Sequence, residues 1–377
     1  MNYLVAGFMK TILVNMLNVT RAGQMTYMVN LLSEVAPLQD YFFVFLINII
    51  AENRLKNMAI SIPQNVRIYT VASRYSYGAT SYIWQVFNLT SIVRKVKPDY
   101  IYAPTHIAYK VPNVKTILAM RNMAIPNFLK IDVPFRMRLN LFFKYFPSVY
   151  SLRRADKVVA VSNYVKDFLK RNVGRNEKDI FVAYHMINSL HRDNDSRLEQ
   201  YGGLGKNDYI VFVPGSYYRY KKFHALLNYM EYVKLPPNAK VIFAGDEADK
   251  KYLTQLKRYK TKAYEPIFKF SLGIQEMKFF YKVAKLVILS SQVEACPNVA
   301  LEALANNSMI LASDIPPFNE ILGNFAIYFD TNDRYDFVKK FETAVSFEPD
   351  AAVQVKQMKK VSGGSSILDI LRFFESE

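Results

Sequence analysis

The sequence predicts an α/β protein made of two doubly wound domains, each built on a parallel sheet. Three observations predict this class. Short apolar runs rich in β-branched residues alternate with segments of helical periodicity, as in strand–helix–strand units. The chain has 377 residues, which is too long for one small core and suits two domains. Hydrophobic residues make up 51% of the chain, so extended disorder is not expected.

The first domain is expected over residues 1–190, where apolar runs recur between helical segments. The predicted strands are Thr11–Leu17, Tyr41–Ile49, Val66–Val71, Asp99–Ala103, Val114–Met120, Val158–Val161 and Ile180–Ile187. The predicted helices are one that ends near Val35, then Ser81–Lys95, Pro134–Tyr150 and Tyr164–Arg171. Ser162 precedes the last helix and suits an N-cap, because its hydroxyl accepts a hydrogen bond from a helix N–H group.

The second domain is expected over residues 209–362, after a polar, glycine-containing linker at 191–208. Its predicted strands are Ile210–Val213, Lys240–Ala244, Leu286–Leu289 and Met309–Ala312. Its predicted helices are His224–Val233, one ending at Val283, one beginning at Pro297, and one or two within 321–362. Proline suits a first helical turn because its missing N–H would have no partner there. A further helix is predicted over Ile367–Phe374.

Two acids follow the predicted strand Leu286–Leu289. Glu294 lies in the loop after this strand, and Glu302 lies eight positions later on the next helix. Ligands of parallel α/β sheets bind at the carboxyl ends of the strands. A carboxylate only accepts hydrogen bonds, so two of them suit the paired hydroxyls of a sugar better than a phosphate. The other interpretation is a loop acid and a solvated helix acid, and these two residues alone leave both open.

The wider sequence around the two acids resembles glycosyltransferase family 4, also called glycosyltransferase group 1. That family has a Glu, seven residues, Glu signature, then an Ala-Ser pair and a Pro-x-x-Glu-type turn. The matching segments here are Glu294, Cys296-Pro297-Asn298, Leu301-Glu302-Ala303, Ala312-Ser313 and Ile315-Pro316-Pro317-Phe318-Asn319-Glu320. The resemblance implies the GT-B fold, in which two Rossmann-like domains face each other across a cleft. It also implies that the terminal helix, residues 367–377, returns to the first domain.

The same resemblance implies roles for the acids. Glu302 would hold the ribose hydroxyls of a nucleotide donor, and Glu294 the hydroxyls of the transferred sugar. Main-chain N–H groups near Ala295, Cys296, Pro297 and Asn298 would assist Glu294. The chain departs from the family at Asn307 and Met309, where a Gly and a Pro are usual. Asn tolerates left-handed backbone geometry better than most residues, so we expect this turn to be kept.

A basic loop after Gly215 resembles the part of the family that grips the donor pyrophosphate. Lys221 stands at the position of the family's Lys, with Arg219 or Lys222 as the second cation. Ser216 replaces an Arg that often follows the Gly. The alternative is a solvated basic loop. Gly273, in the segment Leu272–Met277, corresponds to the family's loop at the nucleotide base.

Two residues of the first domain also correspond to functional positions of the family. Gly23 is the second glycine of a Gly-Gly loop that faces acceptor and donor phosphates, and Ala22 replaces the first. Arg121 stands where the family often has a His near the reacting sugar. A guanidinium cannot act as a base, but it can bind phosphate or anchor an acidic acceptor. A surface Arg on a loop is the alternative.

The charge of the chain is strongly positive and uneven. The formal net charge is +17, and residues 1–200 hold 26 Lys and Arg against 12 Asp and Glu. Such a field attracts anionic lipid, nucleic acid or acidic glycan. Basic and aromatic residues mix over Pro134–Tyr150, a pattern typical of contact with a membrane surface. The same pattern suits an apolar stripe facing the core, and this interpretation is favoured because every α/β helix needs one.

The numbers of cysteine and histidine residues limit which cofactors and which cellular compartment are expected. A single Cys cannot form an internal disulfide, which fits a reducing cytosol. We expect Cys296 to be a packed loop residue, since no His is near it in sequence. With four His and one Cys a Cys/His zinc site is not expected, and no Asp-x-Asp cluster precedes a phosphate loop. We therefore expect no cofactor and no required metal.

A transmembrane segment is not expected, because Lys10, Asn15 and Asn18 interrupt the apolar start of the chain. An uncleaved anchor there is the alternative. We expect a cytoplasmic protein, with peripheral attachment to an anionic membrane as an option.

The expected activity is that of a nucleotide-sugar-dependent glycosyltransferase of the hexosyltransferase type. It would move a sugar from a nucleoside-diphosphate donor, bound mainly to the second domain, to a hydroxyl of a glycan or lipid-linked acceptor on the first. The resemblance implies retention of anomeric configuration. A non-catalytic binder of nucleic acid or anionic surfaces on the same fold is the alternative. The strongest motif lies outside the basic half, which argues against nucleic acid.

Overall fold

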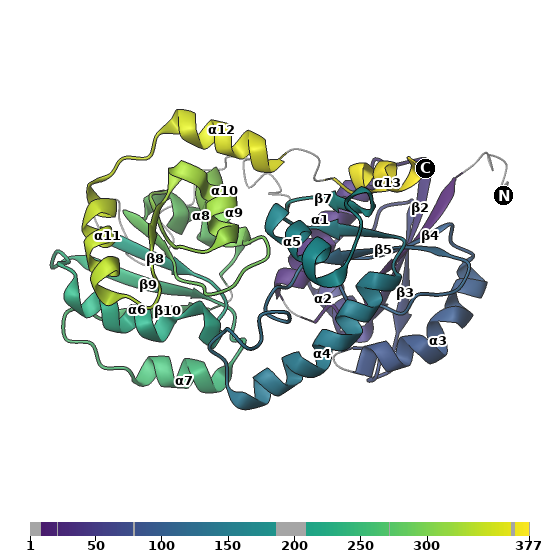
Figure 1. Ribbon diagram of the computed structural model, residues 1–377, viewed down its shortest axis with the longest axis horizontal. Helices are drawn as coiled ribbons and strands as arrows, with labels where there is room; N and C mark the ends of the chain where they lie inside the picture. The colour runs from purple at the N-terminus through teal and green to yellow at the C-terminus, as the bar shows by residue number, and fades with distance from the viewer. Residues whose placement is uncertain are drawn as a thin grey trace. The chain divides into compact units, whose positions relative to one another are not determined.

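The computed structural model describes residues 9–20, 22–77, 80–185, 209–270, 272–362 and 366–376 (Figure 1). The expected linker at 191–208 lies outside these residues. The described residues form two compact units. The first is drawn from Met1–Ile125, Asn140–Tyr184 and Gly364–Glu377, and the second from Pro126–Leu139 and His185–Gly363. Each unit is a parallel α/β sheet with its helices, as the sequence predicts.

Within the described residues, the first unit has a seven-stranded sheet in the order β3-β2-β1-β4-β5-β6-β7, and every pairing is parallel. The strands are β1 (Lys10–Asn15), β2 (Tyr41–Asn48), β3 (Val66–Val71), β4 (Tyr100–Ala103), β5 (Lys115–Met120), β6 (Lys157–Ala160) and β7 (Ile180–Val182). The helices are α1 (Ala22–Val35), α2 (Ile49–Asn57), α3 (Ser81–Val96), α4 (Phe135–Arg154), α5 (Asn163–Phe168) with a π-helical turn (Leu169–Val173), and α13 (Ile367–Glu375). The boundary between the units falls within α4, after Leu139.

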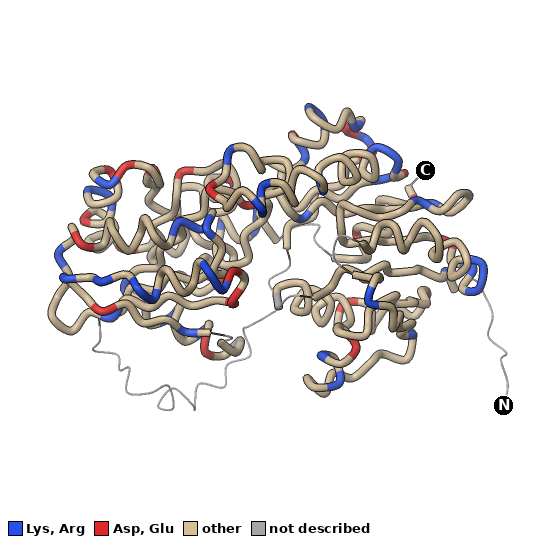
Figure 2. The backbone as a smooth tube through the Cα atoms, turned by 90° about the horizontal axis from the view of Figure 1, so that it is seen from below, with Lys and Arg blue, Asp and Glu red and all other residues tan. Residues whose placement is uncertain are grey.

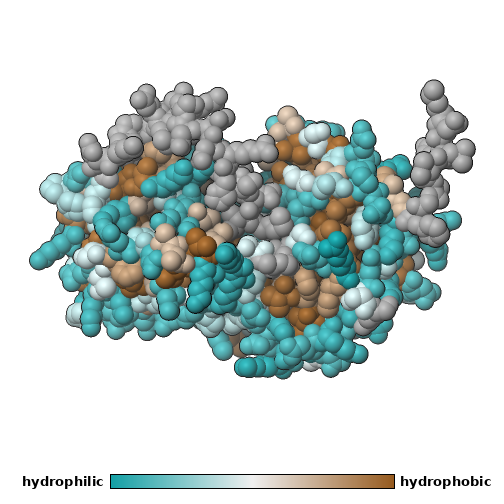
Figure 3. All heavy atoms as spheres, turned by 90° about the horizontal axis from the view of Figure 1, so that it is seen from above, coloured by the Kyte–Doolittle hydropathy of each residue, from teal (hydrophilic) through white to brown (hydrophobic). Residues whose placement is uncertain are grey.

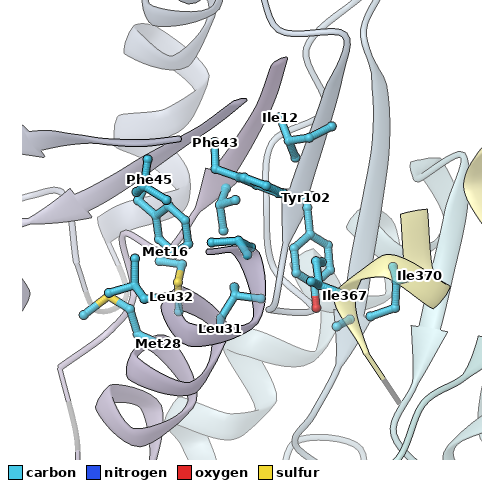
Figure 4. Close-up of a cluster of buried hydrophobic side chains, with 14 of the residues drawn as sticks. Ile12, Met16, Met28, Leu31, Leu32, Phe43, Phe45, Tyr102, Ile367 and Ile370 are labelled. Carbon is cyan, nitrogen blue, oxygen red and sulfur yellow. The ribbon is translucent and has the colours of Figure 1, made fainter. Parts of the chain in front are cut away.

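Helices cover both faces of the first sheet, which makes it doubly wound. Side chains of α1, α2 and α13 pack with alternate strand residues such as Ile12 and Phe43. Figure 4 shows Ile367 and Ile370 of α13 beside Tyr102 of β4 in this cluster. On the opposite face, α3 packs against the intervening strand residues, in a cluster that includes Leu13, Leu46, Leu89 and Val93.

Within the described residues, the second unit has a six-stranded parallel sheet in the order β10-β9-β8-β11-β12-β13. The strands are β8 (Tyr209–Pro214), β9 (Ala239–Gly245), β10 (Pro266–Phe270), β11 (Leu286–Leu289), β12 (Ile310–Ser313) and β13 (Ile327–Phe329). The helices are α6 (Phe223–Tyr229), α7 (Lys250–Arg258), α8 (Ile274–Val283), α9 (Asn298–Ala305), α10 (Pro316–Leu322), α11 (Arg334–Ser346) and α12 (Ala351–Ser362). Val211 packs toward α6 and α11, whereas Phe212 stacks on Phe280 of α8, so this sheet is also covered on both faces.

Most predicted strands and helices are confirmed to within a few residues. The turn at Asn307 is confirmed as left-handed, with φ of 54°. Elements that the sequence analysis did not anticipate are α2, α7, β10 and β13. The turn after β12 continues into α10, because its two prolines occupy the first positions of that helix.

The predicted apolar side of α4 that faces the core is present, but the aromatic residues of the helix do not form it. Its buried residues are Leu141, Ser148, Ser151 and Leu152. Phe143 and Phe146, by contrast, are exposed. The core contacts of α4 are therefore made by smaller side chains on another face of the helix.

Charge and hydrophobicity are distributed over both units. Lys and Arg occur along the trace of each unit, with fewer Asp and Glu between them (Figure 2). On the face shown in Figure 3, hydrophobic side chains lie in separate spots among hydrophilic ones. Among the described residues, no helix has the length and the apolar run needed to cross a bilayer.

Gly245 ends β9 where the backbone of the neighbouring strand comes very close. A Cβ atom at this position would lie 1.9 Å from the carbonyl oxygen of Gly215. Gly245→Ala must therefore push two strand ends apart, and overpacking of this kind costs about 1–3 kcal/mol. We expect urea unfolding to show a fall of that size in the free energy of unfolding.

Gly23 provides the matched control for this prediction. A Cβ atom there meets nothing within 4 Å. Because Ala is a better helix former than Gly, Gly23→Ala should leave stability unchanged or raise it by up to ~1 kcal/mol. Equal stabilities of the two alanine variants would contradict the close approach at Gly245.

His106 is a buried neutral histidine in the loop after β4. Burial, helped by the positive charge of Lys144, lowers its pKa to about 4. The unfolded chain takes up this proton at higher pH than the folded one, so stability is lost as pH falls from about 6.5. Between pH 7 and pH 4.5 the loss attributable to His106 should be about 2–3 kcal/mol.

His106→Gln should remove this part of the acid sensitivity. The measurement is urea unfolding of both proteins at pH 7 and pH 4.5. Stability curves that run parallel over this range would show that His106 does not carry the effect.

Candidate functional site

The second sheet reverses its strand order between β8 and β11. The chain adds β9 and β10 on one side of β8, and β12 and β13 on the far side of β11. At such a switch point the loops after two neighbouring strands diverge, and a ligand can enter between them. The loops that follow β8 and β11 carry Lys221 and Glu294. The topology therefore puts the predicted cation and the predicted carboxylate at the same edge of one sheet.

Lys221 and Glu294 form an ion pair. Ser291 also donates a hydrogen bond to the same Glu294 oxygen, at 2.7 Å. The two charged side chains are only 12% and 14% exposed. Burying both charges costs desolvation energy that their attraction often does not repay. The presence of this ion pair is therefore weak evidence that it serves only to stabilise the fold. The structure thus brings together two residues that the sequence assigned separately to phosphate and to sugar.

Hydrogen bonds between the two loops hold this pair in place. The Ser290 hydroxyl donates to the Lys221 carbonyl oxygen at 2.7 Å, and the Gln292 N–H donates to the Tyr220 carbonyl at 2.8 Å. Gly215 directly follows β8 and has φ of 146°, a backbone conformation that residues other than glycine rarely adopt. Its Cα faces the Lys221 stem, because a Cβ atom there would meet Lys221 Cδ at 3.8 Å.

Arg219 pairs with an acid that the sequence analysis missed. Its Nε donates to Asp132 at 2.9 Å, and the other Asp132 oxygen lies 3.4 Å from Nε2 of His224. The Asp132 N–H donates to the side chain of Gln292. Burial lowers the pKa of His224, and Asp132 acts against this. Asp132 lies 87 residues from Arg219 in sequence, in the segment before α4, and no local pattern marks it.

Glu302 lies on α9 and faces α8. Its carboxylate accepts a hydrogen bond from the Tyr281 hydroxyl at 2.9 Å. Burial raises the pKa of the Glu302 carboxyl, and the bond from Tyr281 acts against this. The contact of Glu302 is therefore with α8 and not with the Lys221–Glu294 pair. Its assignment to the ribose of a donor stays a prediction.

The loop from Glu294 to α9 is packed tightly against the unit. Ala295, Cys296 and Pro297 are buried, which agrees with the interpretation of Cys296 as a packed residue. The N–H of His185 lies 3.4 Å from the Cys296 sulfur. Asn298, the first residue of α9, is exposed, and its Oδ1 lies 2.6 Å from Nδ1 of His185. The start of α9 presents the positive end of the helix dipole at this edge.

Three further predicted residues occupy helix starts or turns. Ser216 follows Gly215, and its carbonyl oxygen accepts from the Tyr218 N–H. Lys222 has left-handed geometry, with φ of 58°, between the 3₁₀ turn Arg219–Lys221 and α6. Gly273 is the exposed N-cap of α8, and its N–H donates to Glu276.

Arg121 and Gly23 belong to the first unit. Arg121 follows β5, and its guanidinium lies 3.5 Å from the centre of the Tyr27 ring on α1. The Tyr27 hydroxyl is 2.8 Å from that of Tyr102, and burial raises the pKa of both. Gly23 lies one helical turn before Tyr27 on the same side of α1. Since a Cβ atom at Gly23 would meet open space, packing does not require a glycine there.

Among the described residues, no group of three or more His, Cys, Asp and Glu is placed to hold a metal ion.

Comparisons with known proteins match both halves of the chain. The model of Glycosyltransferase Family 4 matches residues 23–189, and that of Glycosyl transferases group 1 matches residues 195–361. The O-antigen chain mannosyltransferase RfbU of Salmonella typhimurium is 22% identical over 330 residues, which cover 86% of each chain.

Solved structures show the same architecture. HepE from Anabaena, in complex with UDP-glucose, has a TM-score of 0.67 at 16% identity, covering 96% of this chain and 95% of that one. WaaG, a glycosyltransferase involved in lipopolysaccharide biosynthesis, has a TM-score of 0.69 at 10% identity, covering 96% and 98%. With these matches and the two parallel-sheet units, the chain belongs to the family 4, group 1 glycosyltransferases and has their GT-B fold.

Proposed function

We propose that this glycosyltransferase transfers a sugar from a nucleoside-diphosphate donor to a hydroxyl of a glycan or lipid-linked acceptor, with retention of anomeric configuration. The observation that carries the proposal is the Lys221–Glu294 pair at the β8/β11 switch point. A cation and a carboxylate side by side can bind the two groups that the breaking bond joins, the diphosphate and the sugar. The cation faces the phosphate, and the carboxylate faces the sugar hydroxyls.

The chemical step needs stabilisation of the leaving diphosphate. The bond between the sugar anomeric carbon and the phosphate oxygen breaks, and a bond to the acceptor oxygen forms on the same face. The acceptor proton passes to the leaving phosphate oxygen. Lys221 would stabilise the negative charge that develops on the diphosphate, and the N-terminus of α9 would add its dipole. Arg219 would contribute only after its bond to Asp132 is exchanged for one to phosphate.

We propose roles at the donor or the acceptor for other predicted residues. We propose that Glu294 orients the sugar, Glu302 holds the ribose, and Gly273 lies at the base. Gly215 and Gly23 would let phosphates approach the backbone. Arg121 would anchor the acceptor in the first unit. We propose that the reaction needs no metal.

Proteins similar to this chain support the proposed donor and acceptor classes. HepE was solved with UDP-glucose, UDP, and UDP with glucose. RfbU is an O-antigen chain mannosyltransferase, and WaaG is a glycosyltransferase involved in lipopolysaccharide biosynthesis. Another protein of similar structure, WaaB, is a lipopolysaccharide outer core galactosyltransferase. A carbohydrate chain at or near a lipid is therefore the acceptor class that we propose.

The test is a thermal-shift panel of nucleoside diphosphates and their sugars, followed by transfer assays with the stabilising donor. We expect one nucleotide to raise the melting temperature, and NMR of the product to show the donor's anomeric configuration. A product of inverted configuration would refute retention. A protein stabilised by none of the nucleotides would refute the proposed donor class.

A further inference from the structure

Asp132 holds Arg219, one of the cations proposed for the donor diphosphate, by a contact to which the proposed reaction gives no role. The segment Pro126–Leu139, which carries Asp132, belongs to the second unit, as Arg219 does. Arg219 Nε donates to Asp132 at 2.9 Å. The oxygens of a carboxylate accept hydrogen bonds from a guanidinium, as those of a phosphate do. Asp132 therefore occupies on Arg219 a place that a phosphate could take.

The backbone around Asp132 is fixed in place. Ile131 and Val133, on either side of it, are only 3% and 6% exposed. The Asp132 N–H donates to the side chain of Gln292, in the loop after β11, at 2.8 Å. Because the backbone is held, the carboxylate stays available to Arg219 at a high effective concentration, even when Arg219 binds another anion.

The ion pair of Asp132 with Arg219 can open at low cost. The two side chains are 28% and 36% exposed, about twice to three times as much as those of Glu294 and Lys221. Ion pairs that water reaches contribute little to stability, so a diphosphate with several negative charges can replace the single carboxylate. A further contact of Arg219, from Nη1 to the side chain of Gln255, is 3.5 Å long and involves a neutral group.

His224 gives Asp132 a second partner that remains when Arg219 turns away. Its Nε2 lies 3.4 Å from the other Asp132 oxygen, and its Nδ1 lies 2.9 Å from the Tyr252 hydroxyl. Burial lowers the pKa of His224, so the ring is neutral at pH 7. A lone pair on Nε2 would repel the carboxylate, so the proton belongs on Nε2, and Nδ1 accepts from Tyr252. The Asp132 carboxylate thus keeps a donor without Arg219, which makes the exchange reversible.

We infer that Asp132 competes with the donor diphosphate for Arg219 and thereby speeds release of the nucleoside diphosphate product. Donor binding transfers Arg219 from Asp132 to phosphate, and after sugar transfer Asp132 takes Arg219 back. The product then loses one of its cations and leaves more readily, a step that often limits turnover in enzymes. This inference rests on the proposed function, because it needs Arg219 at the diphosphate. It adds a residue that acts on product release and not on the bond that breaks.

Asp132→Asn tests the inference, because it removes the competing charge and keeps the shape and an oxygen that accepts from His224. The probes are UDP, GDP, ADP, CDP and dTDP, each titrated calorimetrically into the full chain. The diphosphate that binds the unaltered protein should bind Asp132→Asn about fivefold more tightly, the upper range for an exposed ion pair. Surface plasmon resonance should show that most of this gain is a slower dissociation.

Arg219→Gln, alone and combined with Asp132→Asn, separates exchange from a general effect of charge. Exchange requires both partners, so these two variants should bind the diphosphate with equal affinity. Glu342→Gln removes an exposed acid from α11 of the same unit and is the control for net charge. It should bind as the unaltered protein does. Melting temperatures measured without nucleotide show that each variant folds.

Equal affinity of Asp132→Asn and the unaltered protein for the diphosphate would overturn the inference. Weaker binding by Asp132→Asn would also overturn it, and would show that Asp132 positions Arg219 for phosphate. A gain that persists in the Arg219→Gln background would assign the effect to the local electrostatic field. In these three cases the unaltered protein binds a diphosphate, so the proposed donor class stands. A protein that binds none of the five diphosphates would overturn both the inference and the proposed donor class.

Discussion

Lys221→Ala is expected to lower kcat/KM for sugar transfer by about 10²–10³-fold. The reason is that the variant loses the fixed positive charge that we propose acts on the leaving diphosphate, and removing one such electrostatic contact typically costs about 3–4 kcal/mol in the transition state. The measurement is the initial rate of transfer with the donor that the thermal-shift panel identifies. Lys240→Ala, an exposed lysine of β9, is the control and should keep full activity.

The structure adds a complication that the loop sequence does not reveal. From sequence, Lys221→Ala should leave folding intact. In the fold, however, the variant leaves Glu294 mostly buried without its cation, which typically costs about 3–5 kcal/mol. Assays should therefore run well below the melting temperature of the variant.

A double variant separates the two effects. Lys221→Ala with Glu294→Gln removes both charges, so it should regain much of the lost stability without regaining activity. If transfer by Lys221→Ala at saturating donor equals that of the unaltered protein, Lys221 has no role in the reaction. If the double variant recovers activity together with stability, the loss in the single variant was one of folding.

Glu302→Ala is expected to weaken nucleoside diphosphate binding by about 10- to 100-fold. A hydrogen bond to a charged acceptor is worth about 1.5–3 kcal/mol, and in the proposed site the ribose would offer two hydroxyls to this carboxylate. The 2′-deoxy form of the nucleotide makes the prediction specific. The unaltered protein should bind it more weakly than the ribonucleotide, whereas Glu302→Ala should bind both alike. Calorimetric titration gives all four affinities.

Tyr281→Phe is the control for this second prediction. Glu302→Ala also leaves the Tyr281 hydroxyl without the acceptor it has in the structure. Tyr281→Phe removes that hydrogen bond and keeps the carboxylate, so it should retain the preference for the ribonucleotide. A preference that survives in Glu302→Ala would mean that the ribose is held elsewhere.

Strands, helices and motif residues could be predicted wherever a short stretch of sequence determines them. The runs Val66–Val71 and Leu286–Leu289 were predicted with the bounds that the structure shows. Leu286–Leu289 is a continuous apolar segment, as buried parallel strands are, whereas the edge strand Val66–Val71 was found from its β-branched residues. The left-handed turn at Asn307 was predicted from the tolerance of one residue type. Lys221 and Glu294 were found because the family motifs name them.

Long-range pairings were not available to the same reasoning. The ion pair of Lys221 with Glu294 spans 73 residues, and that of Arg219 with Asp132 spans 87. Each depends on which loops meet at a sheet edge. The aromatic residues of α4 were misassigned for a related reason, since periodicity shows that a helix has an apolar side but not which side meets the sheet. In α4 the buried apolar residues are Leu141 and Leu152.

The position of α13 in the core of the first unit has a consequence during synthesis of the chain. Ile367, Leu371 and Phe374 share one buried cluster with β1, β2 and α1, and the Ile367 N–H donates to Glu34 of α1. A ribosome makes all of the second unit before it reaches these residues. At typical elongation rates this leaves the nascent first unit lacking part of its apolar cover for roughly 10–40 s. A nonsense mutation near residue 366 would thus harm the part of the protein that is translated first.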